Sequence, residues 1–223
     1  MRGEDIIQHT GVTVHAAGVD LEGDLAIPQG AEAVVIFAHG SGSSRHSPRN
    51  RSVADVLHSA GLATLLFDLL TPEEEAIDLR TRALRFDIAL LADRLTGAVD
   101  WAGTQPATRR LRVGLFGAST GAAAALIAAA QRPESVGAMV SRGGRPDLAG
   151  DALSAVQAPT LLIVGGEDTL VIELNRQASG LMRAERRLEI IPGASHLFEE
   201  PGALDQVAQR ACDWFTRHLS IRR

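Results

Sequence analysis

The sequence contains neither lysine nor tyrosine, and all 22 basic residues are arginine. Without lysine, P-loop, Schiff-base and pyridoxal chemistry are excluded, and so is the Tyr/Lys pair of short-chain dehydrogenases. Without tyrosine, no phenol can stabilise an oxyanion. Backbone N–H groups are therefore the expected donors to any oxyanion that forms during a reaction.

Cysteine, long apolar runs and basic clusters are also scarce. The single cysteine, Cys212, cannot form an internal disulfide, and its apolar neighbours favour a role as a buried small hydrophobic residue. Met1–Asp5 carries acids instead of a signal core, and no apolar run approaches the roughly 18 residues of a membrane span. We therefore expect a soluble cytoplasmic protein with no membrane partner. A formal net charge of −5 without a basic run argues against a nucleic-acid partner.

Alternating apolar segments predict one α/β domain over residues 1–223. A chain of 223 residues with 45% hydrophobic residues can bury a sizeable core. We predict strands over 6–16, 19–27, Ala33–Ala38, 62–68, 111–116, 136–141, 160–165 and 187–191, and helices over 49–60, 79–102, 120–131, 151–156, 170–183 and 203–219. This order predicts a mostly parallel central sheet with an N-terminal antiparallel hairpin, helices on both faces and no lid domain.

A G-x-S-x-G motif, Gly117–Gly121, lies between a predicted strand and an alanine-rich predicted helix. Glycines at 117 and 121 allow a sharp strand-to-helix turn that leaves the Ser119 hydroxyl exposed at the end of the sheet. A serine hydroxyl is a weak nucleophile unless a base activates it. The motif therefore predicts a nucleophile elbow centred on Ser119.

Two candidate partners for Ser119 follow later predicted strands. Asp168 ends the segment GGED and could orient a histidine, although a helix N-cap is its alternative role and Glu167 its possible substitute. His196 lies in a Gly/Ser-containing turn after the last strand and is the expected general base. Because ligands bind at the carboxyl ends of parallel strands, all three residues should lie at one sheet edge.

The Gly/Ser-rich loop after the third predicted strand is the expected source of oxyanion-hole donors. We predict the N–H groups of Ser41 and Thr120, with Gly42 as the alternative to Ser41. His39, which closes that strand, is expected to order the loop without reacting.

Cationic residues beside this edge are candidates for substrate binding. Arg45, His46 and Arg49 could flank the substrate or face solvent. Arg142 could bind a substrate carboxylate or phosphate, or hold the following Gly143–Gly144 loop by hydrogen bonds. The acidic run after Pro72 favours the start of a helix. No histidine pair has zinc-ligand spacing, so we predict no metal and no cofactor.

The order of elements, with Ser119, Asp168 and His196, resembles the α/β-hydrolase fold and, within it, the dienelactone-hydrolase-like group of small lidless hydrolases. The segments that carry this resemblance are HGSGSSRHSPRNR, LLFDLLTPEEE, SRGGRPDLAG, PTLLIVGGED and PGASHLFEEPG. They look like a bacterial subgroup in which some members are joined to phosphoribosyltransferase domains. Dienelactone hydrolases proper use a cysteine where Ser119 stands, and carry an arginine where Glu199 and Glu200 stand.

The resemblance and the motif together predict a serine hydrolase that cleaves small carboxylic esters or lactones through an acyl-enzyme, as a monomer or homodimer. Thioester hydrolysis, phosphotriester hydrolysis and acyl transfer are alternatives on the same residues, because the triad does not specify the leaving group. A non-catalytic ligand-binding protein is the alternative from another class. Dinucleotide binding at Gly114–Gly117 is disfavoured, because these glycines do not form G-x-G-x-x-G.

Overall fold

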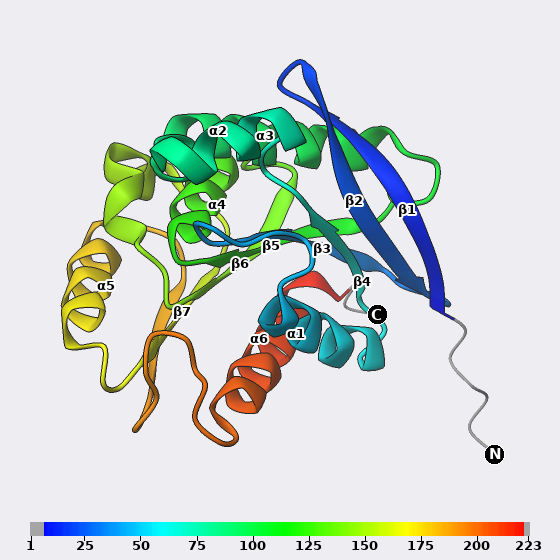
Figure 1. The fold of residues 1–223 in the computed structure, drawn as a ribbon. Coiled ribbons are helices and arrows are strands. Elements are labelled where there is room, and N and C mark those ends of the chain that lie inside the picture. Colours follow the sequence, from blue (N-terminus) through cyan, green and yellow to red (C-terminus); the bar gives the residue numbers. More distant parts are fainter. Residues whose placement is uncertain (1–6, 221–223) are drawn as a thin grey trace.

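The structure is a computed structural model that describes residues 7–220 (Figure 1). Its eight strands are β1 (Ile7–Ala16), β2 (Val19–Pro28), β3 (Ala33–Ala38), β4 (Ala63–Phe67), β5 (Arg112–Ala118), β6 (Val136–Arg142), β7 (Thr160–Gly165) and β8 (Arg186–Ile191). Each matches a predicted strand to within a few residues. Position 6 of the first predicted strand, and the acidic segment Met1–Asp5, lie outside the described residues.

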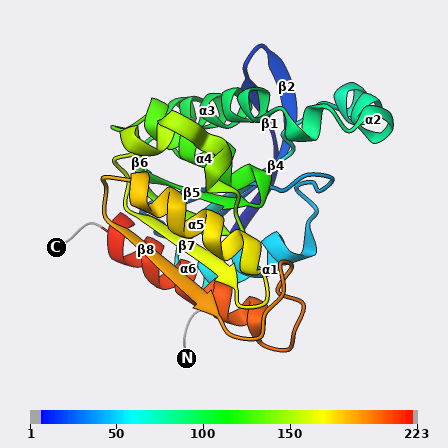
Figure 2. The same cartoon turned by 90° about the vertical axis from the view of Figure 1, so that its left-hand side faces the viewer.

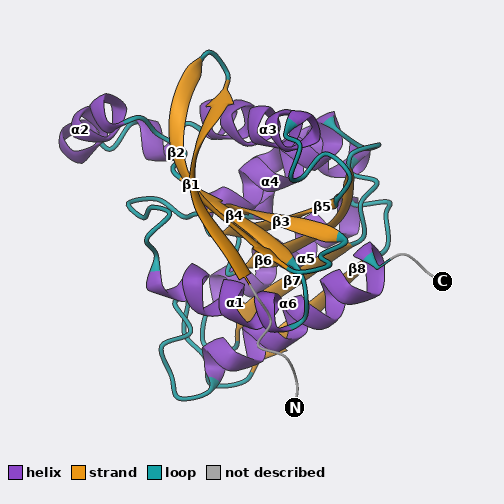
Figure 3. Ribbon diagram, turned by 90° about the vertical axis from the view of Figure 1, so that its right-hand side faces the viewer, coloured by secondary structure: helices purple, strands orange, loops and turns teal. Residues whose placement is uncertain are grey.

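All eight strands form one mixed sheet in the order β1-β2-β4-β3-β5-β6-β7-β8. The hairpin of β1 and β2 pairs antiparallel from Ile7 with Pro28 to Ala16 with Val19, and β2 pairs antiparallel with β4. Every other neighbouring pair is parallel. Figure 3 shows the hairpin at one side of this twisted sheet. The predicted α/β fold, with its N-terminal hairpin, is confirmed.

The α-helices are α1 (Pro48–Ser59), α2 (Pro72–Thr81), α3 (Ile88–Thr104), α4 (Thr120–Gln131), α5 (Thr169–Leu181) and α6 (Ala203–Leu219). Two predictions are wrong in detail. The continuous helix over 79–102 is instead α2, the short 3₁₀ helix η1 (Leu84–Phe86) and α3. The short helix over 151–156 is instead η2 (Pro146–Ala155), a 3₁₀ segment kinked at Gly150.

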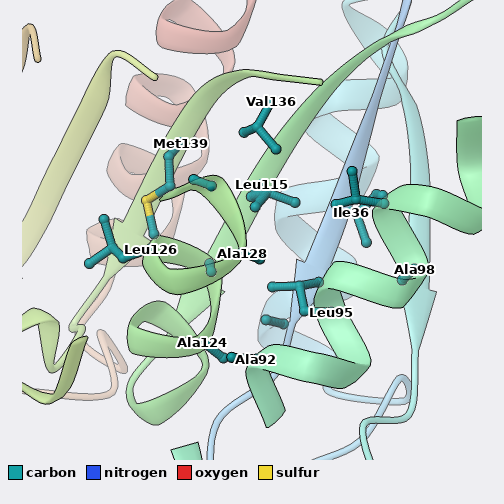
Figure 4. Packing of buried hydrophobic residues seen from close by; sticks show 14 of the residues in the cluster. Ile36, Ala92, Leu95, Ala98, Leu115, Ala124, Leu126, Ala128, Val136 and Met139 are labelled. Carbon is teal, nitrogen blue, oxygen red and sulfur yellow. The ribbon is translucent and has the colours of Figure 1, made fainter. Parts of the chain in front are cut away.

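Helices cover both faces of the sheet, and the alternation of side chains along β3 shows how. Val34 and Ile36 belong to the apolar cluster that includes α3 and α4, whereas Val35 and Phe37 belong to the cluster that includes α1 and α6. Figure 1 shows these helix pairs on opposite sides of the sheet, and Figure 4 shows Ile36 and Leu95 in the first cluster. Full burial on both faces is why the central parallel strands, such as β3 and β7, are apolar runs, whereas the edge strand β8 is largely exposed and polar.

Cys212 is buried in α6, and burial raises the pKa of its thiol, in agreement with a packing role. Within residues 7–220, none of the helices combines the length and apolarity needed to cross a bilayer.

Candidate active site

Ser119 occupies a strained turn between β5 and α4. Its backbone angles are φ 51° and ψ −121°, in a region that non-glycine residues rarely adopt. The Ser119 N–H donates to the carbonyl of Arg142 at 3.2 Å, which ties the turn to the end of β6. A positive φ at a serine that ends a parallel strand and precedes a helix is the backbone feature of a nucleophile elbow.

The glycines of the motif are needed because the turn is tightly packed. A Cβ atom at Gly117 would lie 2.4 Å from the Cα of Ala122, and one at Gly121 would lie 2.4 Å from the carbonyl oxygen of Ala38. Both distances are far below van der Waals contact, and both obstacles are backbone atoms that cannot swing aside. Any side chain at either position would therefore push α4 away from the sheet.

Asp168 and His196 are joined by a short hydrogen bond. His196 Nδ1 lies 2.6 Å from Asp168 Oδ2, with the His196 side chain 39% exposed and the Asp168 side chain 17% exposed. Asp168 stands at the N-cap position of α5, but its side chain makes no capping hydrogen bond. Among the described residues, Asp168 and not Glu167 is the acidic partner of His196. This arrangement leaves Nε2 as the imidazole nitrogen available to a reacting group.

The turn at Ser119 and the ring of His196 both lie against the segment that ends β6, and no hydrogen bond joins their side chains in the described structure. A Cβ atom at Gly143 would lie 3.6 Å from Cε1 of His196. The residue before it, Arg142, accepts the N–H of Ser119. Hydrogen bonds between nucleophile and base are often long without substrate and tighten in the complex.

The loop after β6 is held by Asn175, a residue that the sequence analysis missed. Asn175 is fully buried in α5, and its Nδ2 donates to the carbonyl of Gly144 at 3.0 Å. The Arg145 N–H donates to the carbonyl of Ser119 at 3.2 Å, which closes the loop onto the elbow. The available signal was a lone polar residue on the apolar face of α5, between Val171 and Ala178.

The predicted oxyanion loop lies directly against the elbow. A Cβ atom at Gly40 would lie 3.2 Å from the Cβ of Ser119. Within the described part of the chain, the N–H groups of Ser41, Gly42 and Thr120 donate to no protein acceptor. Ser41 and Gly42 also line a cavity of about 110 Å³ between this loop and the segment that contains α2 and η1. Figure 2 shows α2 standing out from the main body of the fold.

His39 orders this loop. Its Nδ1 lies 3.0 Å from the carbonyl of Gly40, and its Nε2 lies 3.1 Å from the N–H of Leu69. Since Nε2 faces a donor, the ring is a neutral imidazole that donates through Nδ1. Burial lowers the pKa of His39, which favours the same neutral form.

Arg45 and His46 both have partners within the protein. The Arg45 N–H donates to Asp68 at 2.7 Å, and its guanidinium contacts Asp68 and, at 2.5 Å, Glu22. His46 is exposed, and its Nδ1 accepts from Arg51 at 3.0 Å. Arg45 therefore holds the loop to the sheet edge in this structure, and a role in substrate binding for either residue stays a prediction.

Arg142 is 8% exposed, and its guanidinium makes no hydrogen bond to the Gly143–Gly144 loop among the described residues. Its Nη2 donates to Oδ1 of Asn50 at 3.3 Å, while Nε and Nη1 are buried without a partner. The expectation that Arg142 could hold the glycine loop by hydrogen bonds is wrong, because its guanidinium bonds to Asn50 instead and Asn175 holds the loop. Its predicted role in binding an anion stays open.

The residues that the structure describes include no group of three or more His, Cys, Asp or Glu side chains placed to hold a metal ion. The site thus consists of an elbow serine, an Asp-paired histidine and a set of unpaired backbone N–H groups. Such a site can perform nucleophilic acyl transfer with a histidine base.

The chain belongs to the dienelactone hydrolase family, whose model matches residues 21–221. It is 64% identical to a dienelactone hydrolase from Anabaena variabilis, with a TM-score of 0.95 over 96% of this chain and 99% of that one. A dienelactone hydrolase-like promiscuous phosphotriesterase from metagenomic libraries shares the fold at 18% identity and a TM-score of 0.78, over 96% of this chain and 99% of that one.

A relative from Mycobacterium tuberculosis carries the name "Putative phosphoribosyl transferase". It is 61% identical over 208 residues, which are 93% of this chain and 46% of the relative. This chain therefore spans about half the length of that protein.

Proposed function

We propose that this protein is a serine hydrolase that cleaves small carboxylic esters or lactones. Ser119 attacks the carbonyl carbon, while His196 takes the hydroxyl proton and then gives it to the leaving group. Asp168 orients His196 and stabilises the imidazolium that forms. Water, activated by His196, then hydrolyses the acyl-enzyme, so the reaction needs no cofactor.

The observation that carries this proposal is the 2.6 Å hydrogen bond between His196 and Asp168, at the same sheet edge as the strained turn at Ser119. A structural histidine does not need a partly buried carboxylate partner, and a structural serine does not need positive φ. The unpaired N–H groups of Ser41 and Thr120 support a role as oxyanion-hole donors, with Gly42 as the alternative.

Small, partly apolar substrates suit this site. The described chain carries no lid between β6 and β7, where η2 fills the connection. Leu170 follows Asp168 by two residues and is 69% exposed, and Leu197 follows His196 and is 40% exposed. Exposed apolar side chains beside the reacting groups favour short acyl or aryl esters.

Thioester hydrolysis, phosphotriester hydrolysis and acyl transfer use the same residues and differ in leaving group or acceptor, so a substrate panel separates them. Phosphoribosyl transfer is a substitution at an acetal carbon. That reaction needs no Asp-paired histidine, so the site gives it no support.

Labelling by a fluorophosphonate, followed by intact mass, tests the mechanism. We expect one adduct on the wild type, and none on Ser119→Ala or His196→Ala, because only an activated serine attacks the phosphorus. Matched controls are Ser154→Ala and His15→Ala, which remove an exposed serine and an exposed histidine that are not part of the proposed triad, and both variants should label normally. Absence of an adduct on folded wild type would contradict the hydrolase mechanism and favour a ligand-binding protein.

A further inference from the structure

Arg142 is a buried cation without a buried counter-charge. Among the described residues, no carboxylate lies within ion-pair distance of its guanidinium, and its one hydrogen-bond partner is the neutral amide of Asn50. Two of its donor nitrogens, Nε and Nη1, have no partner. Burying a charge without pairing it is unfavourable, so such a group usually has an unassigned ligand or role.

The surroundings of Arg142 add further positive charge. Asn50 lies in the first turn of α1, a helix of 12 residues with no acidic residue in that turn. The preceding residue, Arg49, also has a buried Nε without a partner. The helix N-terminus carries a partial positive charge, so two guanidinium groups meet the positive end of a helix. Burial first, and then repulsion by Arg49, lowers the pKa of Arg142 to about 10.

The nearby carboxylates do not neutralise this cluster. Arg49 contacts Glu199 at 3.4 Å, but that carboxylate is 65% exposed. Arg51, in the same turn of α1, pairs with Asp24 at 2.8 Å. The positive charge of Arg142 therefore remains uncompensated within the protein.

The cluster lies beside the reacting groups. The carbonyl of Arg142 accepts the Ser119 N–H, and the next residue, Gly143, packs against the ring of His196. The Arg142 side chain extends from this point toward α1. The Arg49 side chain is 35% exposed, so an anion can approach from the solvent side of that residue.

We propose that Arg142, Arg49 and the first turn of α1 form an anion subsite that binds a carboxylate or phosphate group of the substrate while Ser119 attacks the ester. The claim that the bound anion is part of an ester substrate rests on the proposed function. The claim that these residues bind an anion does not. A carboxylate or phosphate supplies acceptors for guanidinium donors, and a helix N-terminus attracts the same charge.

Paired substrates test the subsite through specificity. The measurement is kcat/KM for 4-nitrophenyl hemisuccinate divided by kcat/KM for 4-nitrophenyl butyrate, which share a leaving group and differ in a terminal carboxylate. We expect Arg142→Met to lower this ratio by about 10- to 100-fold, the effect of losing a charge-assisted hydrogen bond. Arg142→Lys should recover part of the loss. The control Arg132→Met removes an exposed arginine paired with Asp100 and should keep the wild-type ratio.

Inorganic phosphate tests binding without catalysis. We expect it to raise the Tm of the wild type by roughly 3 to 6 °C at about ten times its Kd, and to leave the Tm of Arg142→Met unchanged. If Arg142→Met does not melt cooperatively, the specificity ratio and the phosphate-dependent shift in Tm are measured on Arg49→Met, which removes a more exposed side chain.

An unchanged specificity ratio in a folded Arg142→Met or Arg49→Met protein would overturn the substrate assignment, and an equal phosphate shift in wild type and variant would overturn the binding site. If phosphate binding depends on Arg142 while no ester is hydrolysed, the proposed function fails and the anion subsite stands. A phosphate shift with an unchanged ratio would mean that free phosphate is the ligand.

Discussion

The two buried arginines Arg94 and Arg142 are 4% and 8% exposed, and each has a buried Nε without a partner, yet the partners of their other nitrogens differ. Arg94, in α3, donates to the carbonyls of Ala16 and Ala17 at 3.1 and 3.2 Å, and pairs with Glu74 at 2.7 Å. Its ligands all belong to the protein, so it joins the hairpin turn to α2. Arg142 has one neutral acceptor and a second cation nearby. The comparison separates an arginine that completes the fold from one whose charge is left for a ligand.

Arg94→Met should cause the largest change in stability. The substitution leaves Glu74 partly buried without its cation and removes two hydrogen bonds to the hairpin turn, so we expect a loss of about 3 kcal/mol. Urea unfolding measures it, with Arg132→Met as the control. That exposed pair should be worth less than about 1 kcal/mol. Equal losses in the two variants would show that Arg94 is no more structural than a surface arginine.

Arg142→Met should change the free energy of unfolding in the opposite direction, so that the variant is at least as stable as the wild type. Burial, and then repulsion by Arg49, lowers the pKa of Arg142 to about 10, and each pKa unit is worth about 1.4 kcal/mol, so the gain is limited to a few kcal/mol. Below about pH 10 both the folded and the unfolded state hold the proton, so the gain should be the same at pH 6 and pH 9. Above that value the folded state releases its proton first, and the unfavourable charge fades.

Urea unfolding of Arg142→Met at the two pH values checks this expectation. A loss larger than about 1 kcal/mol at either pH would mean that Arg142 makes stabilising contacts in the way Arg94 does.

Asn50→Asp should give Arg142 a carboxylate partner within the protein, as Arg94 has in Glu74. Of the three substitutions, it should change the free energy of unfolding least. The new carboxylate would lie where Oδ1 of Asn50 now accepts from Arg142 at 3.3 Å, and in the first turn of α1, where an acid is favourable. We expect a gain of about 1 kcal/mol and loss of the phosphate-dependent rise in Tm. Asn50→Ala is the matched control, which removes the acceptor without adding charge. A phosphate response that survives in Asn50→Asp would argue against a shared site.

The central strands could be predicted because residues buried on both faces must be apolar, as in Ala33–Ala38. The break between α2 and α3 could not be predicted from apolar spacing alone, since apolar residues continue through it. It depends on Arg82 in the left-handed region and on Asp87 capping α3 by accepting the Leu90 N–H at 3.0 Å. Thr71 and Glu74 form a capping box at the start of α2, and that spacing was a readable signal.

The residues of the candidate site divide in the same way. The motif at Ser119 could be read locally, because its glycines and its place between a strand and a helix are adjacent in sequence. Asn175 could not be assigned, because its acceptor, the Gly144 carbonyl, lies 31 residues away. The role of Arg45 could not be assigned for the same reason, since its carboxylate partners Glu22 and Asp68 come from distant segments.

The sequence by itself determined the class of fold, the strained turn that only glycine neighbours permit, and the chemistries that a chain without lysine or tyrosine must do without. These are properties of single residues and of local periodicity. Only the tertiary structure decided that Asp168 pairs with His196 and does not cap α5, and that Arg94 finds a carboxylate while Arg142 does not. The physical reason is that the energy of a buried polar group depends on partners that the fold brings together from distant parts of the chain.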